Sequence, residues 1–181
     1  MRIISGTLKG RRLFAPNSQN TRPTSDRIRE SLFSILGEKV LDGEILDLFA
    51  GTGALGIEAL SRQAKHCSFA EPDKSALKTL QKNLEFVTKE QYTLFKTSAL
   101  HALKRLNHQS KTFDIVFLDP PYEGCHAEEV WAWMRKNTLL NPEGLVVYEH
   151  SAKKTLENNY FNLRCKESRI FGDTALSFFM E

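Results

Sequence analysis

From residue 44 onward the sequence alternates short apolar runs with stretches of helical periodicity. The apolar runs predict strands at Ile45–Phe49, His66–Glu71, Tyr92–Lys96, Phe113–Asp119 and Leu145–His150. The stretches between them predict helices at Ala54–Arg62, Lys74–Val87, Ala99–Arg105 and Ala127–Lys136. Strands that alternate with helices in this way pair in parallel, and the helices cover both faces of the sheet. The sequence therefore predicts an α/β fold built on a mostly parallel sheet.

The C-terminal end of the chain departs from this alternation. Phe161–Glu167 and Thr174–Met180 are strand-like runs around a Gly172-Asp173 turn. This pattern predicts an antiparallel hairpin at an edge of the sheet, which brings the predicted sheet to seven strands. The length of 181 residues fits a single domain, residues 1–181.

Positive charge is concentrated at the other end of the chain. Residues 1–36 hold seven basic groups and two acids, whereas the net charge of the whole chain is only +3. Within residues 1–24 the pattern predicts a small basic β-hairpin, with strands Arg2–Ser5 and Arg11–Ala15, followed by a polar loop. Thr24 or Ser25 then caps a predicted helix that Gly37 ends.

Most of these basic groups are arginines, whose planar guanidinium donates two hydrogen bonds to a phosphate at once. This predicts a nucleic-acid contact surface, with a solvated surface arm as the alternative. The candidate nucleic-acid-binding residues are Arg11, Arg12, Arg22 and Arg29.

A glycine-rich loop separates the first strand of the alternating region from its helix. Gly51, Gly53 and Gly56 match the pattern G-x-G-x-x-G, which lets the backbone turn tightly and approach a ligand. Taken alone, the loop suits a dinucleotide as well as S-adenosylmethionine. Asp47 favours S-adenosylmethionine, because its carboxylate can accept from an amino-acid ammonium group, which NAD lacks. Glu71 ends the next strand, where it can reach the ribose of either cofactor.

A second motif, Asp119-Pro120-Pro121-Tyr122, follows a predicted buried strand. It is therefore expected at the carboxyl edge of the sheet, where open α/β sheets bind ligands. The motif suits an exocyclic amine of a nucleobase, a poor nucleophile because its lone pair is delocalised into the ring. Asp119 and the Pro120 carbonyl can accept its two protons, the paired prolines fix the backbone, and Tyr122 offers a ring for stacking.

Together these motifs resemble the class I S-adenosylmethionine-dependent methyltransferases that modify exocyclic amines of nucleobases. More narrowly, the chain resembles the bacterial ribosomal small-subunit methyltransferase D family, over nearly its whole length. The N-terminal segments Arg2–Gly6, Lys9–Leu13 and Arg22–Glu30 narrow the resemblance, as does Phe171–Leu176 near the C-terminus.

The resemblance implies a Rossmann-like class I methyltransferase fold and methylation of the N2 amine of one guanine in 16S rRNA. It also implies a small-subunit particle as the substrate. The sequence itself shows no feature that demands a dimer, a metal or a membrane, so we expect a monomer in the cytoplasm. The methyl donor S-adenosylmethionine would be held by Asp47, Phe49, Ala50, Gly51, Thr52, Gly53, Glu71 and Ser98. The guanine would be held by Asp119, Pro120, Pro121 and Tyr122. Ser98 stands where the family often has an aspartate that holds the adenine amine.

Other functions fit parts of these patterns. A DNA adenine or cytosine amino-methyltransferase uses the same chemistry, but 181 residues leave little room for a separate target-recognition domain. A non-catalytic RNA-binding assembly factor could keep the fold, although the intact Asp119 and glycine loop count against it. A NAD-dependent oxidoreductase is disfavoured by Asp47.

Composition excludes several other classes. The chain is 41% hydrophobic and 26% charged, as globular proteins are, so it is neither disordered nor fibrous. No apolar run is long enough for a membrane helix or an export signal. Cys67, Cys125 and Cys165 are widely spaced, which predicts neither a disulfide framework nor a zinc site.

Overall fold

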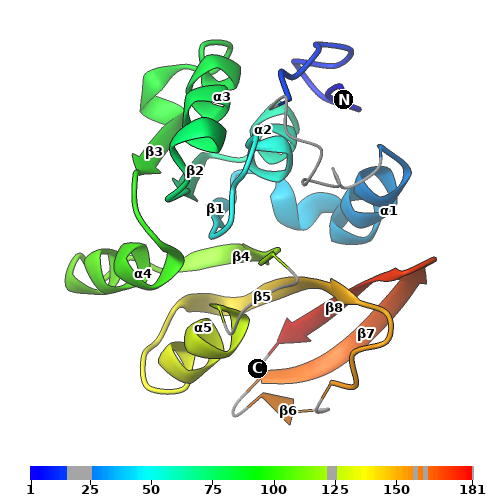
Figure 1. The fold of residues 1–181 in the computed structure, drawn as a ribbon, viewed down its shortest axis with the longest axis vertical. Helices are drawn as coiled ribbons and strands as arrows, with labels where there is room; N and C mark the ends of the chain where they lie inside the picture. Colours follow the sequence, from blue (N-terminus) through cyan, green and yellow to red (C-terminus); the bar gives the residue numbers. More distant parts are fainter. Residues whose placement is uncertain (16–25, 122–125, 157–158, 161–162, 181) are drawn as a thin grey trace.

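The computed structural model describes residues 1–15, 26–121, 126–156, 159–160 and 163–180. The described residues form one eight-stranded sheet in the order β3-β2-β1-β4-β5-β8-β7-β6 (Figure 1). All pairings from β3 to β5 are parallel, and those from β5 to β6 are antiparallel. The predicted α/β architecture is therefore confirmed.

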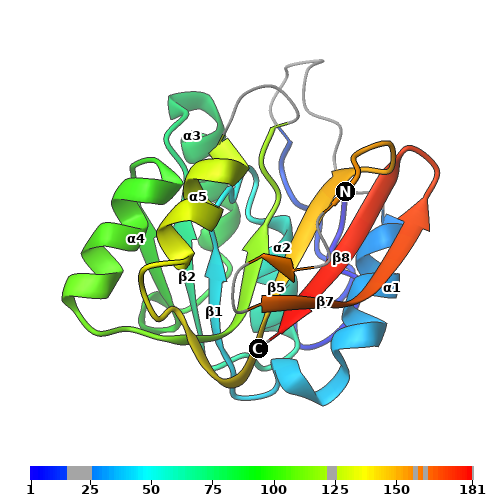
Figure 2. The same cartoon turned by 90° about the horizontal axis from the view of Figure 1, so that it is seen from below.

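The strands agree with the sequence-based expectation, with one addition. The parallel strands are β1 Glu44–Asp47, β2 His66–Ala70, β3 Tyr92–Phe95, β4 Phe113–Leu118 and β5 Leu140–Ser151. The C-terminal hairpin consists of β7 Leu163–Phe171 and β8 Thr174–Met180, which extend the sheet beyond β5 (Figure 2). The addition is β6, Asn159–Tyr160, a two-residue edge strand that is too short to leave a periodic signal.

Helices cover both faces of the sheet. They are α1 Asp26–Leu36, α2 Ala54–Ser61, α3 Lys74–Leu84, α4 Ala99–His108 and α5 His126–Met134, with short 3-10 turns at Gly37–Val40 and Lys89–Gln91. The apolar sides of α1, α2 and α3 share one core with the sheet, and those of α4 and α5 share the core on its other face (Figure 1). Among the described residues, no helix is both long and apolar enough to span a membrane.

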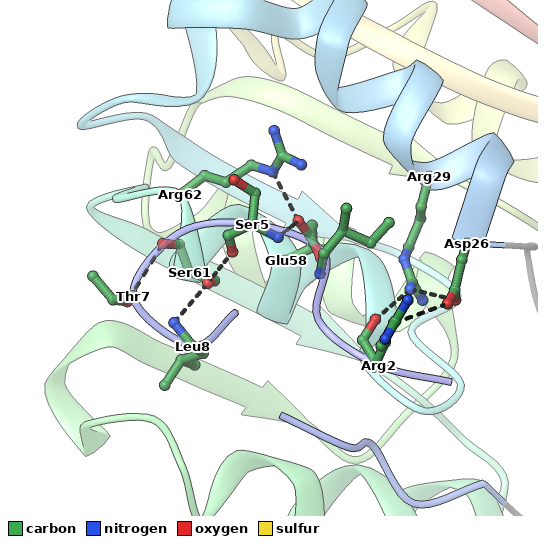
Figure 3. A network of polar contacts seen from close by, with 10 residues as sticks. Arg2, Ser5, Thr7, Leu8, Asp26, Arg29, Glu58, Ser61 and Arg62 are labelled. Carbon is green, nitrogen blue, oxygen red and sulfur yellow. Dashed lines mark hydrogen bonds and ion pairs between the residues drawn. The ribbon is translucent and has the colours of Figure 1, made fainter. Parts of the chain in front are cut away.

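The N-terminal segment differs from the predicted hairpin of two strands. Residues 1–15 contain a single antiparallel bridge, between Arg2 and Arg12, and no regular strand. The two arms still bond across the turn, since the Ile3 amide donates to the Arg11 carbonyl oxygen at 2.9 Å. The amides that follow Ile3 bond to α2 (Figure 3). The amides of Ile4 and Ser5 donate to the two carboxylate oxygens of Glu58, at 2.7 and 3.0 Å.

The same segment approaches α2 at backbone distance. Gly6 has φ +82°, and a Cβ atom there would lie 1.7 Å from the Ser61 carbonyl oxygen, so only glycine fits. Next to it, the amides of Thr7 and Leu8 donate to Ser61, through its carbonyl oxygen and its hydroxyl respectively (Figure 3). These contacts fix the basic segment to the helix that follows the glycine loop.

Glu58 is a buried, charged anchor of this segment, and its loss is expected to destabilise the protein. The side chain of Glu58 is fully buried and also pairs with Arg62 at 2.8 Å. Glu58→Ala leaves the amides of Ile4 and Ser5 without these acceptors, so the free energy of unfolding should fall by about 1–3 kcal/mol. Urea unfolding measures this change. Glu90→Ala, at an exposed carboxylate, is the control, and an equal effect there would show that Glu58 is not an anchor.

Candidate functional site

Carboxylates gather where the central parallel strands end. They are Asp47 in β1, Glu71 directly after β2, Asp119 directly after β4 and Glu149 near the end of β5. Because parallel strands end at one edge of a sheet, these groups share that edge. Asp47, Glu71 and Glu149 are buried, and Asp119 is partly buried.

Strand register places three of these carboxylates on the same face. Asp47 pairs with Phe117, and Phe117 pairs with Val147. Side chains two residues apart on a strand point to the same face, so Asp119 and Glu149 lie on the face of Asp47. This is the face that α1, α2 and α3 cover.

The glycine loop combines packing with open space. A Cβ atom at Gly53 would come 2.4 Å from Leu80 Cδ1, and one at Gly56 would come 2.2 Å from Phe69 Cε1. These two glycines therefore allow close packing of the loop on α3 and of α2 on β2. At Gly51, with φ +54°, a Cβ atom would meet nothing within 4 Å. Gly51 is thus the position at which the loop leaves room for a ligand.

Glu71 holds the glycine loop in shape. Its Oε2 accepts from the Gly51 amide and its Oε1 from the Asp73 amide, both at 2.8 Å. Asp73 in turn caps α3 by accepting from the amides of Ser75 and Ala76. Each oxygen of Glu71 keeps a second lone pair, so the carboxylate can shape the loop and still accept from a ligand. The sequence predicted only the ligand contact.

Burial makes this edge favourable for a cation. Asp47 Oδ2 accepts from the Gly56 amide at 3.2 Å, yet burial raises the pKa of Asp47 to about 7, and the Glu71 carboxylate adds to the shift. Burial also raises the pKa of Asp119 well above its usual range, with Glu149 and Asp47 contributing. A positively charged ligand stabilises the ionised form of such carboxylates, so this edge of the sheet favours cation binding.

Asn83 in α3 joins the glycine loop to the N-terminal segment. Its Nδ2 donates to the carbonyl oxygens of Thr52, at 2.8 Å, and Phe14, at 3.1 Å, while its Oδ1 accepts from the Phe14 amide at 2.8 Å. Asn83 is fully buried. The sequence analysis missed this residue, although an asparagine on the apolar side of an amphipathic helix was an available signal.

The remaining predicted donor-binding residues lie around the same edge. Ala50 is buried, and Phe49 is half-buried, with its ring 6.5 Å from that of His126. Ser98 precedes α4, beyond the end of β3, and its hydroxyl lies 2.9 Å from His101 Nδ1. The His101 side chain on α4 therefore orients the Ser98 hydroxyl.

A cleft of about 350 Å³ opens at Pro120 and Pro121, the residues that follow Asp119. Its lining includes Pro120, Pro121, Tyr148, Glu149, His150 and Lys154. Lys154 Nζ donates to the Tyr148 hydroxyl and to Glu128, each at 2.9 Å. Pro120 is buried and Pro121 is exposed, while Tyr122 lies outside the described residues. Among the described residues, no group of three His, Cys, Asp or Glu side chains is arranged to hold a metal ion.

The predicted RNA-binding arginines divide into different environments. Arg11 and Arg12 are exposed, and the Arg11 guanidinium lies 4.3 Å from the centre of the Phe86 ring. The prediction for Arg29 is wrong, because its side chain is fully buried and donates to the Arg2 carbonyl oxygen and to Asp26 (Figure 3). Arg29 therefore fastens α1 to the N-terminal segment. Arg22 lies outside the described residues.

Comparisons with known proteins agree with this arrangement. The family model described as conserved hypothetical protein 95 matches residues 1–180. Ribosomal RNA small subunit methyltransferase D from Haemophilus influenzae is 42% identical over 86% of this chain and 81% of its own. The protein of the same name from Escherichia coli K12 is 34% identical over 97% of this chain and 87% of its own.

Solved structures give the same result. The Escherichia coli protein yhhF has a TM-score of 0.87 at 33% identity, covering 99% of this chain and 96% of its own. A protein from Thermus thermophilus has a TM-score of 0.81 at 27% identity, covering 98% of both chains. The chain therefore belongs to the family of the ribosomal RNA small subunit methyltransferase D proteins.

Proposed function

We propose that this protein methylates the N2 amine of one guanine in 16S rRNA, with S-adenosylmethionine as the methyl donor. Methyltransferase activity on rRNA follows from the family. The observation that carries the finer proposal is the arrangement of β1 and β4. These paired strands end in the glycine loop and in Asp119-Pro120, which brings a donor site beside acceptors for an amine.

The residues at the edge of the sheet fit S-adenosylmethionine. The open space at Gly51 admits the donor against the loop backbone. Asp47 would accept from its ammonium group and Glu71 from its ribose hydroxyls, while Ser98 would contact its adenine. When bound, the donor supplies a methyl group on a sulfonium sulfur. Its positive charge offsets the repulsion among the buried carboxylates.

Asp119 and Pro120 prepare the amine for methyl transfer. The Asp119 carboxylate and the Pro120 carbonyl accept the two N–H groups of the amine, which frees the nitrogen lone pair from the ring. Because Pro120 and Pro121 restrict the backbone, the carbonyl is positioned before the base arrives. The protein thus contributes mainly alignment and polar preorganisation. Stacking of the base on Tyr122 stays a prediction.

The exposed N-terminal arginines supply the RNA contact. Arg11 and Arg12 neutralise phosphates, and the bonds from residues 4–8 to α2 hold the segment that carries them in a fixed position. The guanine leaves its stack to reach Asp119, which costs least in a loop.

We further propose that residues 1–181 act as one domain, as a cytoplasmic monomer, on 16S rRNA within a small-subunit particle.

Nucleotide mapping tests the proposed function. 16S rRNA is isolated from cells with and without this protein, and modified nucleotides are located by mass spectrometry. One N2-methylguanine should disappear without the protein and return with the wild type, but not with Asp119→Ala. Loss of a methylated adenine or cytosine instead, or of no modification, contradicts the proposal.

Replacement of Asp119 should separate donor binding from methyl transfer. Asp119→Ala is expected to bind S-adenosylmethionine but to lose about 10²–10³-fold in turnover, because one preorganised acceptor is gone. Asp119→Asn keeps a carbonyl oxygen and should retain more activity. Single-turnover assays on an rRNA fragment, with calorimetry for donor binding, measure both effects. Turnover of the alanine variant within about threefold of wild type would remove Asp119 from the mechanism.

The affinity for the methyl donor should depend on pH through Asp47. The ammonium group of the donor requires an ionised Asp47, whose pKa is about 7 in the free protein. Protonation as the pH falls through 7 competes with binding, so affinity at pH 6 should be about tenfold weaker than at pH 8. Calorimetric titration over this range measures the effect. Asp47→Asn should bind more weakly at pH 8 and show a flatter profile, whereas an unchanged profile rules out Asp47.

Removal of the exposed arginines should lower the salt dependence of RNA binding. Arg11→Ala combined with Arg12→Ala removes two phosphate contacts, so the slope of log K against log salt should shrink by about 1.5. Filter binding at a series of salt concentrations measures this slope. Lys104→Ala with Lys111→Ala, on and after α4, is the control of equal charge. Equal slopes for the two double variants would show that the N-terminal segment is not the RNA surface.

A further inference from the structure

Glu149 is a buried carboxylate at the cleft next to Pro120 that the proposed mechanism has not used. It is 8% exposed and lines the cleft together with Pro120 and Pro121. A carboxylate at the wall of a substrate cleft selects for a ligand that presents an N–H group.

The position of Glu149 relative to Asp119 is set by the sheet. Leu118 pairs with Tyr148 in the parallel register of β4 and β5, so the next residues of the two strands lie level with each other. Both side chains are on the face of Asp47, as the alternation along each strand requires. The contribution of Glu149 to the raised pKa of Asp119 agrees with this proximity. A base whose amine is held by Asp119 would thus bring a neighbouring ring atom within reach of Glu149.

The nucleobases differ at that ring atom. Guanine carries an N1–H donor beside its N2 amine. Adenine has a lone pair at N1 beside its N6 amine, and cytosine has one at N3 beside its N4 amine. A second carboxylate beside Asp119 can accept a hydrogen bond from guanine N1–H. The same carboxylate repels the lone pair on adenine N1 or on cytosine N3. Enzymes recognise a flipped base by hydrogen bonds to its Watson–Crick edge, which includes these ring atoms.

We propose that Glu149 is the residue that selects guanine, by accepting the N1–H group beside the amine held by Asp119. The proposal rests on the proposed function, since it concerns the base that occupies the same site. It assigns Glu149 to base recognition and leaves proton acceptance from the reacting amine to Asp119 and Pro120.

A base analogue tests this role directly. 2-Aminopurine keeps the 2-amino group but carries a lone pair at N1. In an rRNA fragment with 2-aminopurine at the target position, wild-type kcat/KM should fall by at least about 100-fold relative to guanine. Glu149→Gln presents either an amide oxygen or an N–H group to the ring atom. The ratio of kcat/KM for guanine to kcat/KM for 2-aminopurine should therefore narrow to about tenfold or less. The O6 atom, which 2-aminopurine also lacks, affects both enzymes alike and cancels when their ratios are compared.

Controls separate recognition from folding. Glu149→Ala removes both the acceptor and the repulsion, so it should also narrow the ratio if the glutamine variant does not fold. Both variants should bind S-adenosylmethionine with wild-type affinity, which a merely structural role would not preserve. Glu129→Gln, at an exposed carboxylate on α5, should keep the wild-type ratio.

The outcomes distinguish this proposal from the proposed function. If folded Glu149 variants keep the wild-type ratio while the wild type methylates guanine, Glu149 does not select the base and the proposed function stands. If the wild type methylates no guanine in 16S rRNA, the proposed function fails and the role of Glu149 fails with it.

Discussion

The parallel pairing of β1 with β4 is the constraint on which the rest of the site depends. It sets Asp47 opposite Phe117 and brings the glycine loop and the Asp119-Pro120 pair to the same edge of the sheet. A slip of one residue would turn one of these carboxylates to the other face. The register is enforced by burial, because Ile45 and its partner Ile115 are fully buried in the core beneath the edge.

The fold and the positions of the motifs could be predicted because burial leaves a signal in the sequence. Strands covered on both faces contain continuous apolar runs, as Ile115–Leu118 does in β4, and the ends of the strands can be located from these runs. The glycine loop was recognisable for a related reason. Two of its glycines are required by packing against Leu80 and Phe69, and a third leaves open space at the end of β1.

Polar contacts between distant segments left no such signal. Residues 1–15 were predicted as a hairpin, but two of their amides donate to Glu58, which lies more than fifty positions away in the sequence. In the sequence, Arg29 resembles the other surface arginines. In the structure it is buried, and its bond to the Arg2 carbonyl oxygen connects α1 to the N-terminal segment. The spacing of residues along an element reveals which side is apolar, whereas it does not reveal which buried polar group meets which amide.

The carboxylates at the edge of the sheet also show how the site trades stability for binding. The pKa values of Asp47, Glu71 and Asp119 are all raised, mainly by burial, so the folded protein holds these protons more tightly than the unfolded chain does. Such groups destabilise the fold increasingly as the pH rises from the unfolded pKa toward the folded one. For Asp47 that interval ends at about 7, so most of its cost is present near neutral pH.

A cationic ligand reverses this cost, because it stabilises the ionised form of the same carboxylates. Part of the binding energy of the donor thus comes from repulsion built into the free protein. A neutral isostere at Asp47 would remove that repulsion together with the negative charge that attracts a cation, giving a more stable protein that binds a cationic ligand less well. The edge of the sheet therefore favours recognition over stability, while the apolar cores on the two faces supply the stability that this arrangement requires.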